Sequence, residues 1–136
     1  MLRDFPRVAA VAGVELGGCP LASAVALRSF QRGAPIDAIY VRKDAKDHGS
    51  KRDLEGNVHL APNARVVLVE DVITTGGSTL KATEKLRAAG YEVAGVVALV
   101  DRLEGGRENL EAAGLQVRAL YTRDDFMGAT AVTEEG

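Results

Sequence analysis

The stretch from Val66 to Thr79 reads VVLVEDVITTGGST, and three different patterns follow one another within it. The apolar, mostly β-branched run at 66–69 is typical of a buried strand. Two carboxylates, Glu70 and Asp71, come at its end, followed by hydroxyl residues and glycines. Residues 78–89 have helical spacing and stop before Gly90. The stretch therefore predicts a strand, a small-residue loop and a helix start in direct succession.

This succession suits a phosphate-bearing sugar. Glycines let backbone N–H groups approach a phosphate closely, hydroxyls donate to its oxygens, and the helix N-terminus adds partial positive charge. Glu70 and Asp71 can accept hydrogen bonds from ribose hydroxyls or help to hold a hydrated divalent cation. The alternative, two carboxylates that only solvate a strand end, leaves the loop of glycines and hydroxyls without a purpose.

The rest of the chain alternates between short apolar runs and helical patterns. We predict an α/β fold, with a mostly parallel, twisted sheet flanked by helices and right-handed crossovers. The charged and glycine-rich loops then fall at the carboxyl ends of the strands, where such sheets bind ligands. We expect one core domain over residues 1–127 and a flexible tail over 128–136. The predicted strands are 8–12, 36–41, 66–69, 91–100 and 115–121, and the predicted helices are 21–30, 78–89 and 107–113.

Residues 42–56 are polar, and they have the apolar period of neither a helix nor a strand. Two interpretations are open for them. A charge run is often a solvated loop. Long loops of this kind are also functional, and this one is basic enough to act as a mobile lid over an anionic substrate.

Two smaller features lie near the N-terminus. Gly17 and Gly18 precede a predicted helix with Pro20 in its first turn, which fits either a second anion-binding turn or simply a tight turn. Cys19 has no base nearby in the sequence pattern, so we expect it to be a packing residue.

Composition excludes several classes of protein. A net charge of −2 argues against a nucleic-acid binder that relies on bulk electrostatics. A single cysteine excludes an intramolecular disulfide framework and fits a reducing compartment. No apolar run is long enough to span a bilayer, and the first residues lack a signal-peptide core. We expect a cytoplasmic protein with neither nucleic-acid nor membrane partners.

The motif at residues 69–79 closely resembles the phosphoribosyl diphosphate motif of type I phosphoribosyltransferases. Residues 41–49 resemble the catalytic loop of one branch, the orotate phosphoribosyltransferases, and residues 13–22 and 101–106 resemble that branch as well. The resemblance covers about residues 8–126 and implies a Rossmann-like core. It also implies a transferase of pyrimidine biosynthesis, which converts phosphoribosyl diphosphate and orotate to orotidine monophosphate and diphosphate with Mg²⁺.

The resemblance implies a role for each matching residue. Glu70 and Asp71 hold the ribose 2- and 3-hydroxyls. Arg102 pairs with the orotate carboxylate, or else only with Glu104 or Asp101. Mg²⁺ has no direct side-chain ligand and travels with the diphosphate, with a water-mediated contact to Asp71. The cradle of the 5-phosphate is formed by Thr74, Thr75, Gly76, Gly77, Ser78 and Thr79, of which Thr74 also touches the pyrimidine. The diphosphate is contacted by Arg42, Lys43, Lys46 and His48, the last two across a homodimer interface.

These residue types also make chemical sense without the family. Displacing diphosphate from an anomeric carbon passes through a cationic sugar and releases a highly charged group, which preorganised cations stabilise. A lid keeps water from capturing the sugar. The residues expected to act in catalysis are Lys43, Lys46, His48 and Asp71, with Lys46 or His48 as proton donor to the diphosphate.

One departure from the family pattern concerns the base. Orotate enzymes usually have a further N-terminal segment, a hood over the pyrimidine, ahead of the position of residue 8. We expect this hood to be lacking or supplied by something else, in a truncated product, a fragment or a compact relative with altered specificity. Two alternatives to orotate transfer stay open: transfer to another purine or pyrimidine base, and a non-catalytic regulatory protein that binds phosphoribosyl diphosphate.

Overall fold

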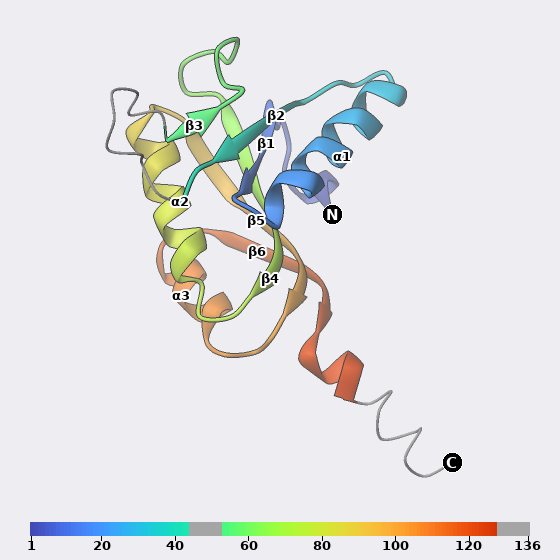
Figure 1. The fold of residues 1–136 in the computed structure, drawn as a ribbon, viewed down its shortest axis with the longest axis vertical. Coiled ribbons are helices and arrows are strands. Elements are labelled where there is room, and N and C mark those ends of the chain that lie inside the picture. Colours follow the sequence, from blue (N-terminus) through green and yellow to red (C-terminus); the bar gives the residue numbers. More distant parts are fainter. Residues whose placement is uncertain (44–52, 128–136) are drawn as a thin grey trace.

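The structure, a computed structural model, describes residues 1–43 and 53–127. Over these residues the chain forms one six-stranded sheet with the strand order β3-β2-β1-β4-β5-β6 (Figure 1). The strands are β1 (Ala10–Val14), β2 (Asp37–Val41), β3 (Leu54–Glu55), β4 (Arg65–Ile73), β5 (Glu92–Asp101) and β6 (Gln116–Thr122). The helices are η1 (Leu2–Asp4), α1 (Gly18–Gln31), α2 (Gly77–Ala88) and α3 (Gly106–Ala112), and residues 123–127 are also helical.

The sheet is parallel except at one edge. β1 pairs in parallel with both β2 and β4, and the parallel pairing continues from β4 to β5 and from β5 to β6. β3 alone runs antiparallel, with Val41 of β2 opposite Leu54. The prediction of a mostly parallel sheet flanked by helices is confirmed.

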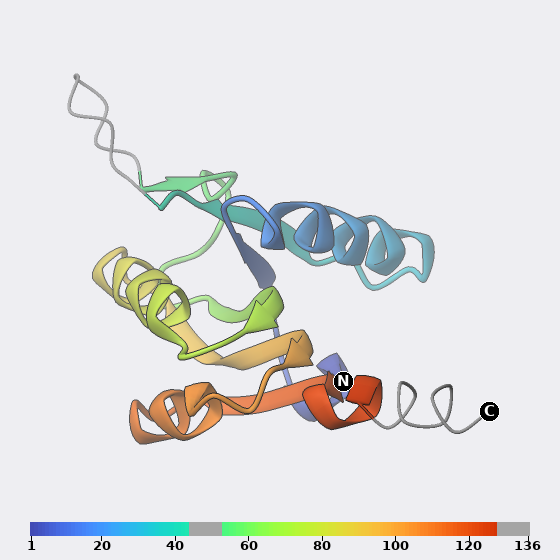
Figure 2. The ribbon, with the colours of Figure 1, turned by 60° about the horizontal axis from the view of Figure 1, so that its bottom comes forward.

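Helices cover the two faces of the sheet: α1 lies on one face, α2 and α3 on the other (Figure 2). Along β1, Ala10 and Ala12 face the core shared with α2 and α3, and Val11 between them faces α1. All of β1 is buried. Burial on both faces is why the strands read as continuous apolar runs rather than as alternating ones.

Two sequence predictions were wrong in detail. The strand predicted at 66–69 continues to Ile73, so Glu70 and Asp71 lie within β4 and not after its end. Val72 and Ile73 keep the strand going because they pair with Val100 and Asp101 of β5.

Residues 42–56 were predicted to have no secondary structure, yet Leu54 and Glu55 form β3. Leu54 is buried at the edge of the sheet. One apolar residue among polar neighbours gives no period to detect. No helix among the described residues is long and apolar enough to cross a membrane.

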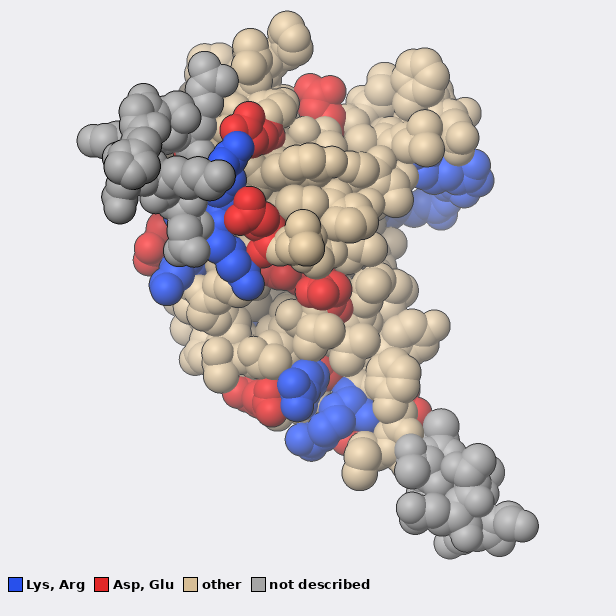
Figure 3. Space-filling model, in the orientation of Figure 1, with Lys and Arg blue, Asp and Glu red and all other residues tan. Residues whose placement is uncertain are grey.

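The topology brings several chain segments to one edge of the sheet. The carboxyl ends of β1, β2, β4 and β5 lie at this edge because the four strands are parallel. Figure 3 shows acidic side chains running through the middle of one face, with basic side chains gathered beside them over α2. Carboxyl ends of parallel strands are the usual ligand sites of such sheets.

Candidate functional site

The loop between β4 and α2 is an open anion cradle. Gly76 precedes α2 with φ +85°, and no side chain caps the helix. The first-turn N–H groups of a helix have no intrahelical partner, so they are free to bind an anion. Gly77 and Ser78 are exposed. Asn109 of α3 holds the loop from behind, since its Nδ2 donates to the Thr75 carbonyl oxygen at 2.9 Å.

Glycine is needed at position 76 for two reasons. Its φ is positive, a region that L side chains rarely adopt. A Cβ there would also lie 3.2 Å from the Gly106 carbonyl oxygen. The turn that presents the helix N-terminus therefore depends on this residue.

The two carboxylates of β4 have different environments. Glu70 is 6% exposed and accepts a hydrogen bond from Thr79 Oγ1 at 2.9 Å. Asp71 is exposed, and its Oδ1 accepts a hydrogen bond from the backbone N–H of Val72 at 2.8 Å. Of the pair, Asp71 presents its charge to the solvent-facing side of the site, while Glu70 links β4 to α2.

Thr79 belongs to the predicted phosphate cradle of residues 74–79, but its hydroxyl bonds to Glu70. Its side chain is buried and turned toward Glu70. Thr83 Oγ1 in turn donates to the Thr79 carbonyl oxygen at 2.8 Å. Because its hydroxyl is engaged, Thr79 can offer only its backbone N–H to an anion.

The environment of Glu70 raises its pKa to about 7. Burial is the largest cause, because it penalises the charged form. The hydrogen bond from Thr79 lowers the pKa, the charge of Asp71 raises it, and the charge of Lys43 lowers it. The Glu70 carboxyl group therefore exchanges its proton near neutral pH.

This pKa predicts a pH dependence of stability. Between pH 4.5 and about 7 the folded state holds more protons on Glu70 than the unfolded state does. The free energy of unfolding therefore falls as pH rises through that window. Glu70→Gln removes the dependence, so we expect its melting temperature to gain on the wild type as pH rises from 5 to 8.

Thermal melts at several pH values check this, with Glu84→Gln as the control, an exposed glutamate on α2. Equal pH profiles for wild type and Glu70→Gln would show that Glu70 is charged in the folded state throughout.

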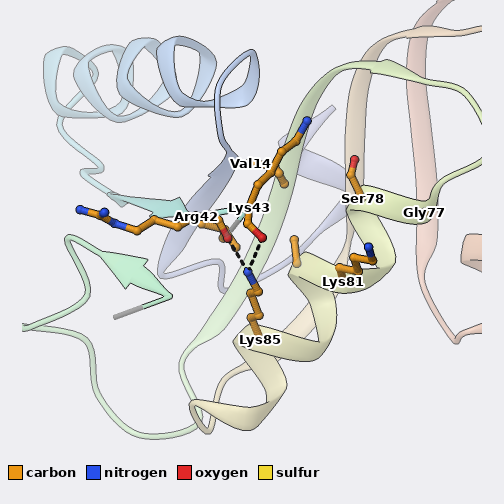
Figure 4. Close-up of a pocket in the computed structure, with 9 residues that line it drawn as sticks. Val14, Arg42, Lys43, Gly77, Ser78, Lys81 and Lys85 are labelled. Carbon is orange, nitrogen blue, oxygen red and sulfur yellow. Dashed lines mark hydrogen bonds between the residues drawn. The ribbon is translucent and has the colours of Figure 1, made fainter. Parts of the chain in front are cut away.

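The end of β2 lies beside the start of α2. A cavity of about 350 Å³ separates them (Figure 4). Figure 4 shows the Arg42 side chain pointing away from this cavity. Its Nη2 pairs with Glu55 Oε1 at 2.9 Å, on β3. The cavity is lined by Val14, Val41, Arg42, Lys43, Gly77, Ser78, Lys81, Ala82 and Lys85.

Not all predicted diphosphate residues can be placed. Lys43 is exposed at this edge. Lys46 and His48 lie outside the described residues, 1–43 and 53–127. The sequence analysis missed Lys81 and Lys85. Their spacing from Ser78, three and seven residues, puts all three on one helix face and was the signal available.

The turn after β5 is built on Asp101. This carboxylate is buried, accepts from the backbone N–H of Leu103 at 2.9 Å and lies 3.4 Å from Arg107 Nε. The backbone N–H of Arg102 donates to the Ile73 carbonyl oxygen at 3.0 Å, which places the turn against the end of β4. The Arg102 side chain is 55% exposed and lies 3.6 Å from Glu104 Oε1. An exposed pair at this distance contributes little, so Arg102 can exchange it for a ligand.

Gly17 and Gly18, at the start of α1, allow close packing. A Cβ on Gly18 would come within 2.6 Å of the Val69 carbonyl oxygen, and a Cβ on Gly17 would overlap the Asp71 carboxylate. This geometry favours the tight-turn interpretation. Cys19 is half-buried with its Sγ 3.7 Å from the Gly13 carbonyl oxygen, and burial raises the pKa of its thiol, in keeping with a packing role.

Known proteins are similar to this chain in sequence and in fold. The family of the phosphoribosyl transferase domain matches residues 5–113. The orotate phosphoribosyltransferase of Sorangium cellulosum is 67% identical over 126 residues, which are 93% of this chain and 66% of the relative. The chain thus spans just under two thirds of that relative's length. It spans 64% of the length of the orotate phosphoribosyltransferase of Synechocystis.

Solved structures of orotate phosphoribosyltransferases have a similar fold. Orotate phosphoribosyltransferase from Aeropyrum pernix superposes with a TM-score of 0.81 at 38% identity, covering 95% of this chain and 68% of that one. The Mycobacterium tuberculosis enzyme, solved in complex with 5-phospho-α-D-ribosyl 1-diphosphate, gives 0.77 at 38% identity over 91% and 68%.

Proposed function

Because the chain belongs to the phosphoribosyl transferase domain family, among the orotate phosphoribosyltransferases, we propose that it transfers the phosphoribosyl group of phosphoribosyl diphosphate to orotate. The products are orotidine 5′-monophosphate and diphosphate, a step of pyrimidine biosynthesis. The observation that carries the proposal is the acidic pair of β4 leading directly into the uncapped start of α2. Such a unit can hold both ends of a ribose 5-phosphate.

The donor's ribose and 5-phosphate occupy the loop after β4. The phosphate accepts hydrogen bonds from the backbone N–H groups of the first turn of α2 and from the hydroxyls of Thr74, Thr75 and Ser78. Asp71 accepts hydrogen bonds from the ribose hydroxyls. Glu70 does so in its ionised form, which donor binding favours because hydroxyl donors stabilise a carboxylate.

The reaction exchanges one bond at the anomeric carbon for another. The C1–O bond to diphosphate breaks and its electron pair leaves with the diphosphate, while N1 of orotate bonds to C1 and releases its proton to solvent. The sugar is cationic along this path, and Asp71 stabilises it electrostatically. Lys43, with Lys46 and His48, neutralises the departing diphosphate, and Lys46 or His48 donates a proton to it.

Magnesium enters as part of the substrate. No group of three or more His, Cys, Asp or Glu side chains that could hold a metal occurs in residues 1–43 and 53–127. The single exposed carboxylate of Asp71 would suit an ion that brings diphosphate oxygens with it and is reached through water. The chemistry that Mg²⁺ would supply there is to offset the charge of the diphosphate.

Orotate is placed by Arg102. Its guanidinium, at the turn that abuts the end of β4, pairs with the orotate carboxylate in place of Glu104. Thr74 contacts the pyrimidine from the other side.

Turnover with a panel of bases tests this proposal. Orotate, adenine, guanine, hypoxanthine and uracil are each supplied with phosphoribosyl diphosphate and Mg²⁺. We expect orotate to be consumed and Arg102→Met to raise its KM by about tenfold or more, the value of one charge-assisted pair. Turnover of a purine in preference to orotate would make this a transferase for another base. Tight donor binding without any turnover would make it a regulatory protein.

We further propose a homodimer in which the basic loop, residues 42–56, acts across the interface. Two inactive variants, Lys46→Ala and Asp71→Ala, are then expected to regain activity on mixing. When the two variants pair at random in equal amounts, about half of the dimers contain one subunit of each kind. Each mixed dimer has one intact site of its two, so about a quarter of wild-type activity is expected to return. Each variant mixed with itself is the control. Mixtures that stay as inactive as their parents would rule out the shared loop.

A further inference from the structure

Lys85 lies on α2, and its ammonium group contacts residues outside that helix. Its Nζ lies 2.5 Å from the Arg42 carbonyl oxygen and 3.0 Å from the Lys43 carbonyl oxygen (Figure 4). It also pairs with Asp53 Oδ1 at 3.4 Å. Two of the three donors of this ammonium thus bond to carbonyl oxygens, and the Asp53 carboxylate pairs with its charge. The side chain is 22% exposed.

These contacts join two parts of the proposed donor site. The residues that Lys85 holds, Arg42 and Lys43, directly follow β2 and belong to the proposed diphosphate side. The helix that carries Lys85 begins at the proposed phosphate loop, about 12 Å away along its axis at 1.5 Å per residue. A backbone hydrogen bond from Arg42 N–H to the Asp53 carbonyl oxygen, at 2.8 Å, ties Asp53 into the same unit.

Lys85 does not itself offer a charge to a ligand, because Asp53 already pairs with it. Lys81, one turn earlier, is exposed on the same helix face and lines the same cavity. The two lysines therefore have different surroundings. Lys81 is exposed, whereas Lys85 holds the backbone of Arg42 and Lys43.

We propose that Lys85 is a positioning residue that sets the distance between the diphosphate contacts at the end of β2 and the phosphate loop of α2. The inference rests on the proposed function. Its physical basis is that a phosphoribosyl diphosphate has charged groups at both ends of a short ribose, so both protein parts must be placed together. Ribose 5-phosphate, which has only the 5-phosphate, uses β4 and the start of α2 and makes no contact at the end of β2.

Binding of two ligands to Lys85→Met separates this role from a merely structural one. Methionine keeps the apolar stem and removes the three donors. We expect Mg²⁺-phosphoribosyl diphosphate to bind about tenfold more weakly, a loss of about 1.4 kcal/mol. Ribose 5-phosphate is expected to bind within about twofold of wild type. Titration calorimetry measures both.

Arg87→Met is the matched control. Arg87 is also a cation of α2 bonded to a carbonyl oxygen, but that oxygen belongs to Ala113 beside α3. The Arg87→Met variant is expected to bind both ligands as the wild type does. Lys85→Arg, which keeps donors and charge, is expected to recover most of the lost donor affinity. Should Lys85→Met not fold, Asp53→Asn removes the charge that pairs with Lys85 and is the milder variant. It is expected to weaken the binding of phosphoribosyl diphosphate more than the binding of ribose 5-phosphate.

Equal weakening of both ligands, or no weakening of either, would overturn the positioning role. Failure of the wild-type protein to bind phosphoribosyl diphosphate would instead overturn the proposed function, and the role of Lys85 in it.

Discussion

Asp71→Asn is expected to lower kcat/KM for phosphoribosyl diphosphate by about 10²–10³-fold, the cost of removing one preorganised charge contact to a transition state. Asp71 is the exposed carboxylate of the β4 pair, and the backbone N–H of Val72 holds its orientation. Asparagine keeps the shape but presents no negative charge to the cationic sugar. Because this charge matters most in the transition state, kcat falls more than donor affinity does.

Steady-state kinetics of Asp71→Asn beside Asp37→Asn checks this expectation. Asp37 is also exposed on a strand, but it lies at the amino end of β2, on the opposite edge of the sheet. Asp37→Asn is expected to behave as wild type. An Asp71→Asn variant with activity within about threefold of wild type would remove Asp71 from the proposed site.

Gly76→Ala is expected to have the second large effect, a loss of at least about a hundredfold in kcat/KM. The added Cβ meets the Gly106 carbonyl oxygen at 3.2 Å and the Leu110 side chain at 3.3 Å, so the loop or these neighbours must give by a few tenths of an ångström, and the positive φ adds strain. Several N–H donors to one phosphate move together, and each bond to a charged group is worth about 1.5–3 kcal/mol. Stability falls as well, by about 1 kcal/mol for a side chain at positive φ.

Gly90→Ala separates the two effects. Gly90 also has a positive φ, at +95°, but no atom lies within 4 Å of its added Cβ. It follows α2, whereas Gly76 precedes it. Both variants are expected to lose stability in thermal melts, and only Gly76→Ala is expected to lose ribose 5-phosphate binding. Normal binding by Gly76→Ala would contradict the placement of the phosphate in this loop.

The sequence predicted the sheet well because its signals are strong and local. Strands buried on both faces must be apolar throughout, and the runs at 66–69 and 91–100 are. Gly76 and Gly90 bracket α2 because both have positive φ. The grouping of Asp71, Lys43 and Arg102 at one edge followed from parallel topology alone.

What the sequence did not predict depends on tertiary contacts. Leu54 and Glu55 form a strand by pairing with Val41 and Tyr40 of β2, contacts that the local sequence does not reveal. The inward turn of Thr79 follows from the burial of Glu70, which no local pattern reveals. Lys85 meets the Arg42 carbonyl oxygen across 43 residues of chain, so its role is visible only once the helix is packed beside β2.

The most direct test of the proposed transfer is its stoichiometry. Wild-type protein is mixed with orotate, phosphoribosyl diphosphate and Mg²⁺, and orotate loss is followed by absorbance while released diphosphate is counted. We predict one diphosphate for each orotate consumed, and none without orotate. Diphosphate release that is independent of orotate, or no release despite bound donor, would contradict transfer at this site.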